Sequence, residues 1–199
     1  GRKRVIADEA GGHLWVLVGL YFFGLLAVLS KENGALIFCF AVIVELTIIF
    51  SRNEKANVFI LSAAAAPILM GLGYYLIFLS NFSHTSYRDF SIYERILTES
   101  RILWDYLAKI VFPISGKMSL DHDDIIVSKS LFEPMATIFS IIAHLILMAT
   151  AIVYRKRSAW IFLAVFGFYS GHLLESTVIP LELYYEHRNY FPSVFVCST

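Results

Sequence analysis

Five long apolar stretches, separated by short polar segments, dominate the chain. They cover residues 14–29, 35–50, 58–79, 135–154 and 159–181, and another apolar run begins near residue 191. Crossing the hydrocarbon core of a bilayer takes about 20 mostly apolar residues in a helix. The pattern therefore predicts an all-α fold, a polytopic membrane helical bundle of about five spans with the start of a sixth.

The segment between the third and fourth spans, residues 80–134, contains a helical pattern of its own. Apolar residues recur there near helical spacing, at Ile92, Ile96, Leu103, Leu107 and Ile110. Arg101, Asp105 and Lys109 follow each other at four-residue intervals on another side, and Pro113 ends the pattern. We expect an external amphipathic helix at the membrane interface, because Asp105 and Lys109 would sit in lipid in a further crossing.

The composition is typical of a membrane protein and argues against a nucleic-acid partner. Hydrophobic residues make up 58% of the 199 positions, above the usual share in soluble domains. Sixteen Lys and Arg balance sixteen Asp and Glu, so no bulk positive charge points to a nucleic-acid partner. No soluble domain, long repeat or low-complexity linker separates the spans, which predicts a single transmembrane unit over residues 1–199.

The ends of the chain and its cysteines add two expectations. The sequence lacks an initiator Met and stops as an apolar run begins, so we expect a fragment of a longer polytopic protein. Cys39 and Cys197 both fall within apolar runs, which favours two buried thiols over a disulfide framework or a metal site.

Three clusters of basic residues predict the orientation in the membrane. They are GRKR (residues 1–4), SRNEK (51–55) and RKR (155–157). Five alternating spans place all three on one face, which the retention of Lys and Arg on the cytoplasmic side predicts to be cytoplasmic. The opposite face then carries SKENG (30–34), residues 80–134 and LELYYEHRNYFPS (181–193), so most of the unusual polar groups are expected outside the cytoplasm.

A polar stripe crosses the last apolar stretch. Tyr169, His172 and Glu175 recur every three residues and share one helix face. They are expected to form either a polar seam between helices or a functional site, and for His172 alone the packing role is favoured. Gly167 and Gly171 form a pair of small residues that would let a neighbouring helix approach closely.

Two polar features belong to the first half of the chain. Lys31 and Glu32 lie at the tip of a very tight hairpin between two spans, where an ordinary polar turn is the favoured interpretation for the segment alone. Glu45 falls within the second apolar stretch, and we expect it to form an interhelical hydrogen bond, because a charge in lipid is expensive.

The sequence SLDHDD, residues 119–124, groups three carboxylates around a histidine. An Asp-x-Asp arrangement such as Asp121 and Asp123, with His122 between them, can hold a divalent ion such as Mg or Mn beside a phosphate. The spacing matches neither a dedicated calcium loop nor a zinc site. A solvated acidic turn is the favoured alternative.

The most concentrated polar cluster is YYEHRNYFPS, residues 184–193. Arg188 offers a planar set of donors that suits a phosphate or a carboxylate, and Glu186 and His187 are placed to orient it or to move a proton. Tyr184, Tyr185 and Tyr190 lie where an interfacial aromatic belt is expected. Three adjacent polar groups exceed what interfacial anchoring requires, so a functional role is favoured for residues 186–188.

Three of these motifs together resemble stretches of a known family. LSKENGALIF, KIVFPISGKMSLDHDD and LELYYEHRNYFPSVFVC resemble, in order and membrane context, the transmembrane O-mannosyltransferases that carry tetratricopeptide repeats, and their bacterial relatives. Those proteins have a Lys-Glu hairpin, a Pro followed by a Leu-Ser-x-Asp-like turn, and a Glu-Arg-x-Tyr-x-Pro-Ser entry to a helix. Here His187 stands between Glu186 and Arg188, which resembles the bacterial relatives more.

The resemblance implies an integral-membrane glycosyltransferase that moves a sugar from a polyprenyl-phosphate donor to a protein or glycan acceptor on the non-cytoplasmic face. It implies a multi-pass protein of the bacterial inner membrane with a periplasmic active face. The acidic catalytic residue of that class lies in the first external loop, so the base is expected upstream of this fragment. No tetratricopeptide repeat is visible in the chain.

Within that chemistry the polar residues take distinct roles. Arg188, Lys31 and His187 are the candidates for binding the donor phosphate, because positive groups there stabilise the leaving phosphate. Supporting roles fall to Glu32, Glu175, Glu186 and Tyr190, and the donor or metal region to Asp121, His122 and Asp123.

Two other functional classes are alternatives to the glycosyltransferase. A transporter would use His172 and Glu175 in a proton or substrate path, and predicts functional polar groups near the midplane and broken helices. A polysaccharide polymerase or ligase shares the lipid-linked donor and external chemistry. The gathering of unusual polar groups on one external face favours the glycosyltransferase.

Overall fold

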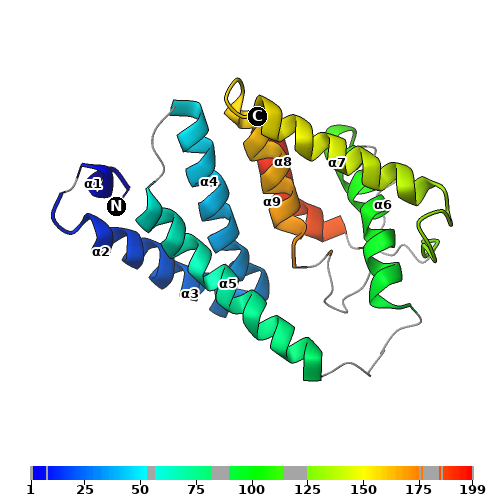
Figure 1. The fold of residues 1–199 in the computed structure, drawn as a ribbon, viewed down its shortest axis with the longest axis horizontal. Coiled ribbons are helices and arrows are strands. Elements are labelled where there is room, and N and C mark those ends of the chain that lie inside the picture. The colour runs from blue at the N-terminus through cyan, green and yellow to red at the C-terminus, as the bar shows by residue number, and fades with distance from the viewer. Residues whose placement is uncertain are drawn as a thin grey trace. The chain divides into compact units, whose positions relative to one another are not determined.

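The computed structural model describes residues 2–7, 9–52, 57–81, 90–113, 125–174, 176, 184 and 186–198 (Figure 1). Every regular element within these ranges is helical, and extended backbone pairs only at an isolated bridge between Ser130 and Glu133. The predicted all-α fold is therefore confirmed for this part of the chain. The chain divides into two compact units, residues 1–84 and 85–199. The expectation of a single membrane unit stays a prediction.

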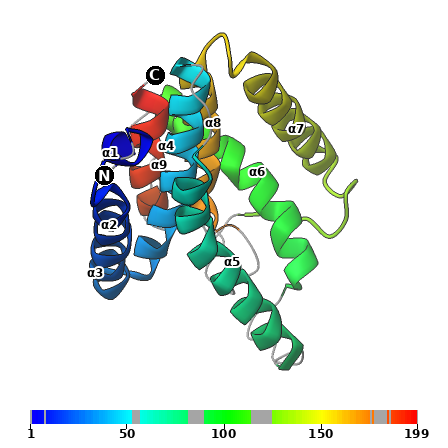
Figure 2. The same ribbon diagram turned by 60° about the vertical axis from the view of Figure 1, so that its left-hand side comes forward.

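The first unit is a set of apolar helices. Its elements are α1 (Arg2–Ile6), α2 (Gly12–Leu17), the π-helical η1 (Val18–Phe22), α3 (Phe23–Ser30), the 3-10 helix η2 (Glu32–Leu36), α4 (Ile37–Arg52) and α5 (Val58–Asn81). The elements α2, η1 and α3 continue directly into one another, as do η2 and α4. Helix α4 packs along α5, and α2 also contacts α5 (Figure 2).

The turn between α3 and η2 is as tight as the sequence predicts. Lys31 adopts an extended conformation that interrupts the helix, and the amide of Gly34 donates to the Lys31 carbonyl at 2.8 Å. A Cβ added to Gly34 would lie 2.1 Å from the carbonyl oxygen of Ala27. Only glycine therefore fits where the two helices turn back on each other.

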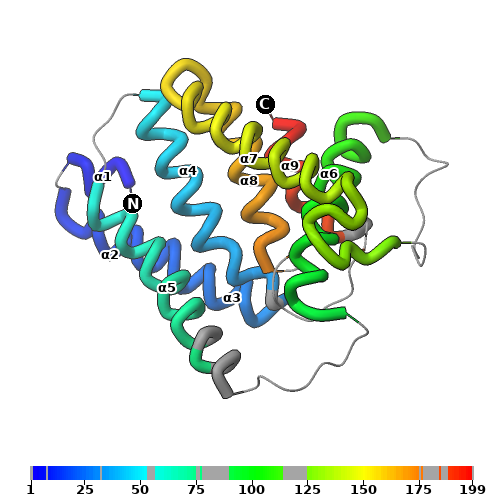
Figure 3. The backbone as a smooth tube through the Cα atoms, turned by 45° about the vertical axis from the view of Figure 1, so that its right-hand side comes forward, coloured from blue at the N-terminus to red at the C-terminus, as the bar shows by residue number. Residues whose placement is uncertain are grey.

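The second unit contains the remaining helices. They are α6 (Ile92–Val111), α7 (Ala136–Tyr154), α8 (Ala159–His172), the 3-10 helix η4 (Glu186–Asn189) and α9 (Tyr190–Cys197). Helix α8 packs against both α7 and α9, and α7 also packs against α6 (Figure 3). Helix α9 begins at Tyr190, next to the predicted start of a further apolar helix, with Pro192 in its first turn.

Helix α6 confirms the helix expected between the third and fourth apolar stretches. Its N-terminus carries a capping box, in which Ser91 Oγ accepts from the amide of Glu94 and the Glu94 carboxylate accepts from the amide of Ser91. The amide and the hydroxyl of Ser91 both donate to the Glu94 carboxylate and hold its pKa below the ordinary value. The helix ends before Pro113, and the expected pair of Asp105 and Lys109 forms at 3.4 Å.

The predicted apolar face of α6 is confirmed in its C-terminal half, where Leu103, Leu107 and Ile110 pack against the buried cluster, and differs in the first turns. Ile92 and Ile96 are about half exposed, at 50% and 47%. The buried stripe instead includes Arg95 and Glu99, which form an ion pair at 3.2 Å with both side chains 2% exposed. Because the two charges neutralise each other one helical turn apart, they can enter the interior where isolated charges cannot.

Within the described part of the chain, three helical stretches are long and apolar enough to cross a membrane, namely Gly12–Ser30, Asn33–Arg52 and Ala136–Tyr154. Shorter apolar helices cover Val58–Tyr74 and Ala159–His172. These lengths and compositions are consistent with a membrane protein, and the predicted number of five spans stays a prediction.

The last predicted span, residues 159–181, is described only in part, because residues 175 and 177–181 lie outside the described residues. Helix α8 has 14 residues and ends at His172, whereas the hydropathy pattern continues to Leu181. At 1.5 Å per residue it spans about 21 Å, short of a hydrocarbon core of about 30 Å. The described residues directly after α8, Leu173 and Leu174, form a turn.

The two cysteines are free thiols in different surroundings. Cys39 is half-buried in α4, whereas Cys197 at the end of α9 is exposed. The expectation of two buried thiols is therefore wrong for Cys197. Its apolar neighbours in sequence predicted burial, but a residue at the end of a short helix packs against little.

Candidate functional site

Arg188 belongs to η4, the turn that leads directly into the apolar helix α9. Its residue is 8% exposed, so the guanidinium is removed from bulk water. The next residue fixes the turn, because the side-chain amide of Asn189 donates to the carbonyl oxygen of Tyr106 at 2.8 Å. Arg188, the residue that the sequence favoured for binding a phosphate, thus lies buried in a turn that is attached to α6.

Close packing of α8 on α9 brings this turn to the end of α8. A Cβ added to Gly167 would lie 2.4 Å from the ring of Phe195, and one added to Gly171 would lie 2.5 Å from Pro192. The predicted role of the two glycines, to admit a neighbouring helix, is confirmed. His172, the last residue of α8, is consequently close enough to Arg188 for an electrostatic interaction.

A stack of aromatic rings forms the wall beside Arg188. Tyr106 is fully buried, and its ring stacks on the imidazole of His172 with centroids 5.0 Å apart and an interplanar angle of 6°. Tyr184 packs on Tyr106 with centroids 4.8 Å apart. Tyr106, Tyr184, Ile102 and Phe168 make up a buried cluster, so a rigid apolar surface supports the polar turn.

A carboxylate, a phenol and an ammonium meet at one point of this wall. The hydroxyl of Tyr184 donates to the carboxylate of Asp105 and accepts from Lys109 Nζ at 2.6 Å. Lys109 also lies 4.9 Å from the centroid of the Tyr184 ring, in a cation–π contact. We name Asp105, Lys109 and Tyr184 the tyrosine triad. With Asn189 it fastens the chain on both sides of Arg188 to α6.

His172 occupies an unusual position for a histidine. The residue is 1% exposed. Its imidazole forms a side-chain hydrogen bond with Asn189, and because Nδ2 of Asn189 donates to Tyr106, the ring N–H of His172 donates to Oδ1. The sequence favoured a packing role for His172, and its stack on Tyr106 agrees with that role.

Tyr169, another residue of the predicted polar stripe, belongs to a polar seam between helices. Tyr169 meets His144 of α7, with the hydroxyl 2.7 Å from Nδ1, and His144 Nε2 lies 2.7 Å from the carbonyl oxygen of Ser100. Because a carbonyl only accepts, Nε2 carries the proton and Nδ1 accepts from the Tyr169 hydroxyl when the ring is neutral. Trp104 stacks on the same imidazole with centroids 4.7 Å apart. His144 therefore joins α6, α7 and α8.

A second polar network ties the chain ahead of α7 to α6. Thr98, Ser128 and Thr137 are all fully buried. The amide of Ser128 donates to Thr98 Oγ1 at 2.8 Å, and the hydroxyls of Ser128 and Thr137 lie 2.9 Å apart. Arg101 adds a hydrogen bond to the carbonyl oxygen of Ile126 at 2.9 Å. Hydrogen bonds thus fix Ile126 and Ser128 to α6, while Ile125 packs against the buried aromatic cluster.

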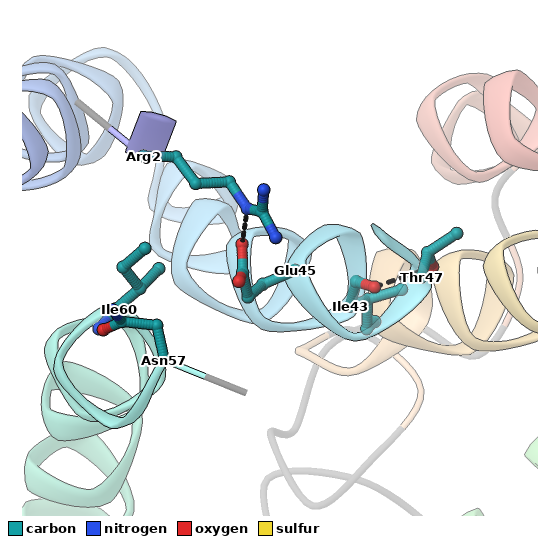
Figure 4. A network of polar contacts seen from close by, with 6 residues as sticks. All are labelled: Arg2, Ile43, Glu45, Thr47, Asn57 and Ile60. Carbon is teal, nitrogen blue, oxygen red and sulfur yellow. Dashed lines mark hydrogen bonds and ion pairs between the residues drawn. The ribbon is translucent and has the colours of Figure 1, made fainter. Parts of the chain in front are cut away.

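Two polar residues of the first unit have defined places. Lys31 is exposed at the α3–η2 turn, as predicted for a hairpin tip. Glu45 is 4% exposed within α4 and accepts from Arg2 Nε at 2.6 Å (Figure 4). The expected interhelical hydrogen bond of Glu45 is confirmed, and its partner is a guanidinium of α1. The shared use of Lys31 and Arg188 as one phosphate clamp stays a prediction.

Several predicted site residues lie outside the described residues. They are Glu175, Asp121, His122 and Asp123, together with the side chains of Glu32, Glu186 and His187. Among the residues that are described, no group of three or more His, Cys, Asp or Glu side chains could hold a metal ion. The divalent cation proposed for residues 121–123 is therefore neither supported nor excluded. Tyr190 is 82% exposed, as an interfacial aromatic residue would be.

Sequence reasoning missed the contacts of Tyr184 and Asn189. Tyr184 was assigned to an aromatic belt, yet its hydroxyl contacts residues 75 and 79 positions away. No local sequence pattern predicts contacts between residues so far apart in the chain. The four-residue spacing of Asp105 and Lys109 was the one available signal, because it placed a carboxylate and an ammonium on one face of α6.

Comparison of the chain with models of protein families, with curated proteins and with solved structures finds no match. The functional argument therefore rests on the side chains and their geometry.

Proposed function

We propose that this chain is part of an integral-membrane glycosyltransferase that transfers a sugar from a polyprenyl-phosphate donor to a protein or glycan acceptor on the non-cytoplasmic face. The observation that carries the proposal is the burial of Arg188 in η4, directly ahead of apolar α9. A guanidinium held at the entry to an apolar helix suits a ligand whose anionic head joins a lipid tail.

The proposed chemistry requires charge stabilisation at the donor phosphate. Transfer breaks the bond between the sugar and the phosphate oxygen, and negative charge grows on the leaving polyprenyl phosphate. A fixed guanidinium in a place from which water is excluded stabilises that charge more strongly than one in solution. Asn189 and the tyrosine triad hold the turn of Arg188 in place before the donor binds.

Other residues complete the proposed site. Lys31 and His187 would share the donor phosphate with Arg188. Supporting contacts are assigned to Glu32, Glu175, Glu186 and Tyr190, and a donor or Mg or Mn region to Asp121, His122 and Asp123. The base that activates the acceptor hydroxyl is not among these residues.

A transporter is the second candidate, and two observations favour it. Helix α8 stops at His172 before it is long enough to cross a bilayer, and Glu45 carries a buried carboxylate within apolar α4. Broken helices and intramembrane charges are typical of transport paths. A transporter would move solute across sealed vesicles without consuming a lipid-linked sugar.

The test is sugar transfer by the full-length protein, with Arg188→Ala and Arg188→Lys as variants. We expect Arg188→Ala to lower transfer from polyprenyl-phosphate sugars by about 100-fold or more, because a lost charge-stabilising donor typically has such an effect. Arg188→Lys should recover only part of it, since an ammonium lacks the planar fork. The matched control is Arg157→Ala in the exposed turn between α7 and α8.

Transfer by Arg188→Ala at the rate of the Arg157→Ala control would refute the phosphate role. Failure of the unsubstituted full-length protein to transfer any sugar, combined with solute uptake into vesicles, would favour the transporter.

A further inference from the structure

Helix α5 of the first unit carries a proline within its length. Pro67 lies inside this 24-residue helix, and proline has no backbone N–H. The carbonyl of Ala63, four residues earlier, therefore loses the amide that would donate to it in an unbroken helix. Ala63 is 8% exposed, so its carbonyl is largely removed from solvent. A buried carbonyl without a donor is unfavourable, and this one requires a partner from another part of the chain.

The hydroxyl of Tyr21 is that partner. It donates to the carbonyl oxygen of Ala63 at 2.8 Å, across 42 positions of the sequence. Tyr21 belongs to the π-helical η1, and its ring contacts that of Phe38 in α4 with centroids 5.9 Å apart. A side chain of η1 thus takes the place of the amide that Pro67 lacks. We name Tyr21, Ala63 and Pro67 the proline latch.

The place of the proline latch along the apolar helices makes this hydrogen bond difficult to replace. Tyr21 lies near the middle of Gly12–Ser30, a stretch long and apolar enough to cross a membrane. Hydrocarbon contains no water that could donate to the freed carbonyl instead of the tyrosine. Removal of the Tyr21 hydroxyl should therefore have a larger effect here than at a protein surface. The π-helical turn that carries Tyr21 is itself a feature found frequently at functional sites.

The proline latch lies where the packing of α5 changes. Before Pro67, Ile60 and Ala64 are buried, and α5 packs along α4. After it, Leu69 and Tyr74 are 67% and 73% exposed, and this half of the helix extends past α3 and α4 (Figures 1 and 2). Contacts with other helices thus fix the first half of α5, whereas the direction of the second half depends on the helix backbone at Pro67.

We propose that Pro67 is a hinge in α5 and that the hydroxyl of Tyr21 holds this hinge in one position. When Tyr21 releases the carbonyl of Ala63, the missing hydrogen bond lets residues 68–81 swing relative to residues 58–66. A movement of η1 therefore changes the direction of the second half of α5. This coupling concerns the first unit alone and does not depend on the proposed sugar transfer.

The test is a cycle of two substitutions in the full-length protein in nanodiscs. Tyr21→Phe removes the hydroxyl and keeps the ring beside Phe38. Pro67→Ala restores the amide that donates to Ala63. If the hydroxyl replaces the missing amide, Tyr21→Phe should have its effect only while Pro67 is present. Tyr74→Phe is the matched control, because it removes a hydroxyl from an exposed tyrosine of α5.

Two measurements follow the hinge. Spin labels on Val58→Cys and Ile77→Cys, at exposed positions roughly 28 Å apart along an α-helix, report the bend of α5 as a distance distribution in pulsed EPR. The background for these labels contains no other cysteine. Thermal unfolding reports the stability of each variant. We expect Tyr21→Phe to broaden the distribution and to lower the unfolding temperature by a few degrees, as the loss of one buried hydrogen bond does.

The expected result is a broad distribution in Tyr21→Phe and a narrow one when Pro67→Ala is added. Effects of equal size with and without Pro67 overturn the inference, because the hydroxyl then does not replace the amide. A Tyr21→Phe distribution equal to that of Tyr74→Phe also overturns it. If Tyr21→Phe alone fails to fold, recovery of the fold by Pro67→Ala supports the proline latch, and failure to recover refutes it.

Discussion

The ring of Phe195 lies against the bare Cα of Gly167, where an added Cβ would come within 2.4 Å of the ring. The contact lies near the base of the phenylalanine side chain, which cannot swing away, so α8 and α9 would have to separate. We expect Gly167→Ala to lower the free energy of unfolding by about 1–3 kcal/mol through overpacking. Thermal unfolding of the purified protein measures the change.

Gly73→Ala provides the matched control for that prediction. A Cβ at Gly73 in α5 meets nothing within 4 Å, and alanine is the better helix former by about 1 kcal/mol. The control should therefore be neutral or stabilising. Equal effects of the two substitutions would show that α8 and α9 do not pack closely at Gly167.

Tyr184→Phe should loosen the turn that carries Arg188. The substitution keeps the ring on Tyr106 but removes the hydroxyl shared by Asp105 and Lys109. Because Asp105 is half exposed and regains water, we expect a loss of about 1–2 kcal/mol in unfolding free energy. Hydrogen exchange of the η4 amides should become faster, and transfer activity should fall with it.

Tyr190→Phe is the control for the tyrosine triad, since Tyr190 is 82% exposed two residues after Arg188. The unfolding free energy of this control and the hydrogen exchange of its η4 amides should stay unchanged. If Tyr184→Phe behaves like Tyr190→Phe, the triad does not hold the turn in place.

Hydropathy predicted the long helices because their sequences are apolar almost throughout. The fourth predicted stretch, residues 135–154, differs from α7 by one residue at its start. The two glycines of α8 were recognisable because their four-residue spacing places both on one helix face. Local patterns therefore sufficed wherever the interaction was itself local or the helix uniformly apolar.

Tertiary contacts explain what the sequence did not predict. Arg95 and Glu99 occupy the interior of α6, while Ile92 and Ile96 on the predicted apolar face stay half exposed. A pattern of single residues counts each charge as polar, although a charge pair can be buried together. The candidate site depends on such contacts as well, because Asn189 and Tyr106 are 83 positions apart.

Arg2→Gln should destabilise the attachment of α1 to α4. The change leaves the carboxylate of Glu45 buried, with its second oxygen already lacking a hydrogen-bond partner among the described residues. Breaking a buried ion pair typically costs about 3–5 kcal/mol, and the partial exposure of Arg2 reduces this to roughly 2–4 kcal/mol. Limited proteolysis of the N-terminal segment and thermal unfolding should both report the loss.

Arg4→Gln tests the same residue type in the same helix at a surface ion pair. Arg4 and Glu9 lie 3.7 Å apart with both side chains more than half exposed, so less than about 1 kcal/mol is expected. The double variant Arg2→Met with Glu45→Leu should recover stability, because two apolar side chains leave no charge buried. Failure of the double variant to recover would mean that the charges themselves are required.

The capping box of α6 should make the first turn of that helix sensitive to acid. Hydrogen bonds from the amide and hydroxyl of Ser91 lower the pKa of Glu94 below its ordinary value of 4.5. The stabilisation is therefore present above 4.5 and is lost as the pH falls through the lower pKa of the folded state. Hydrogen exchange of the first-turn amides should speed up over that interval. Glu94→Gln, which keeps the cap without a titrating group, should remove the pH dependence, and Ser91→Ala should cost about 1 kcal/mol at neutral pH.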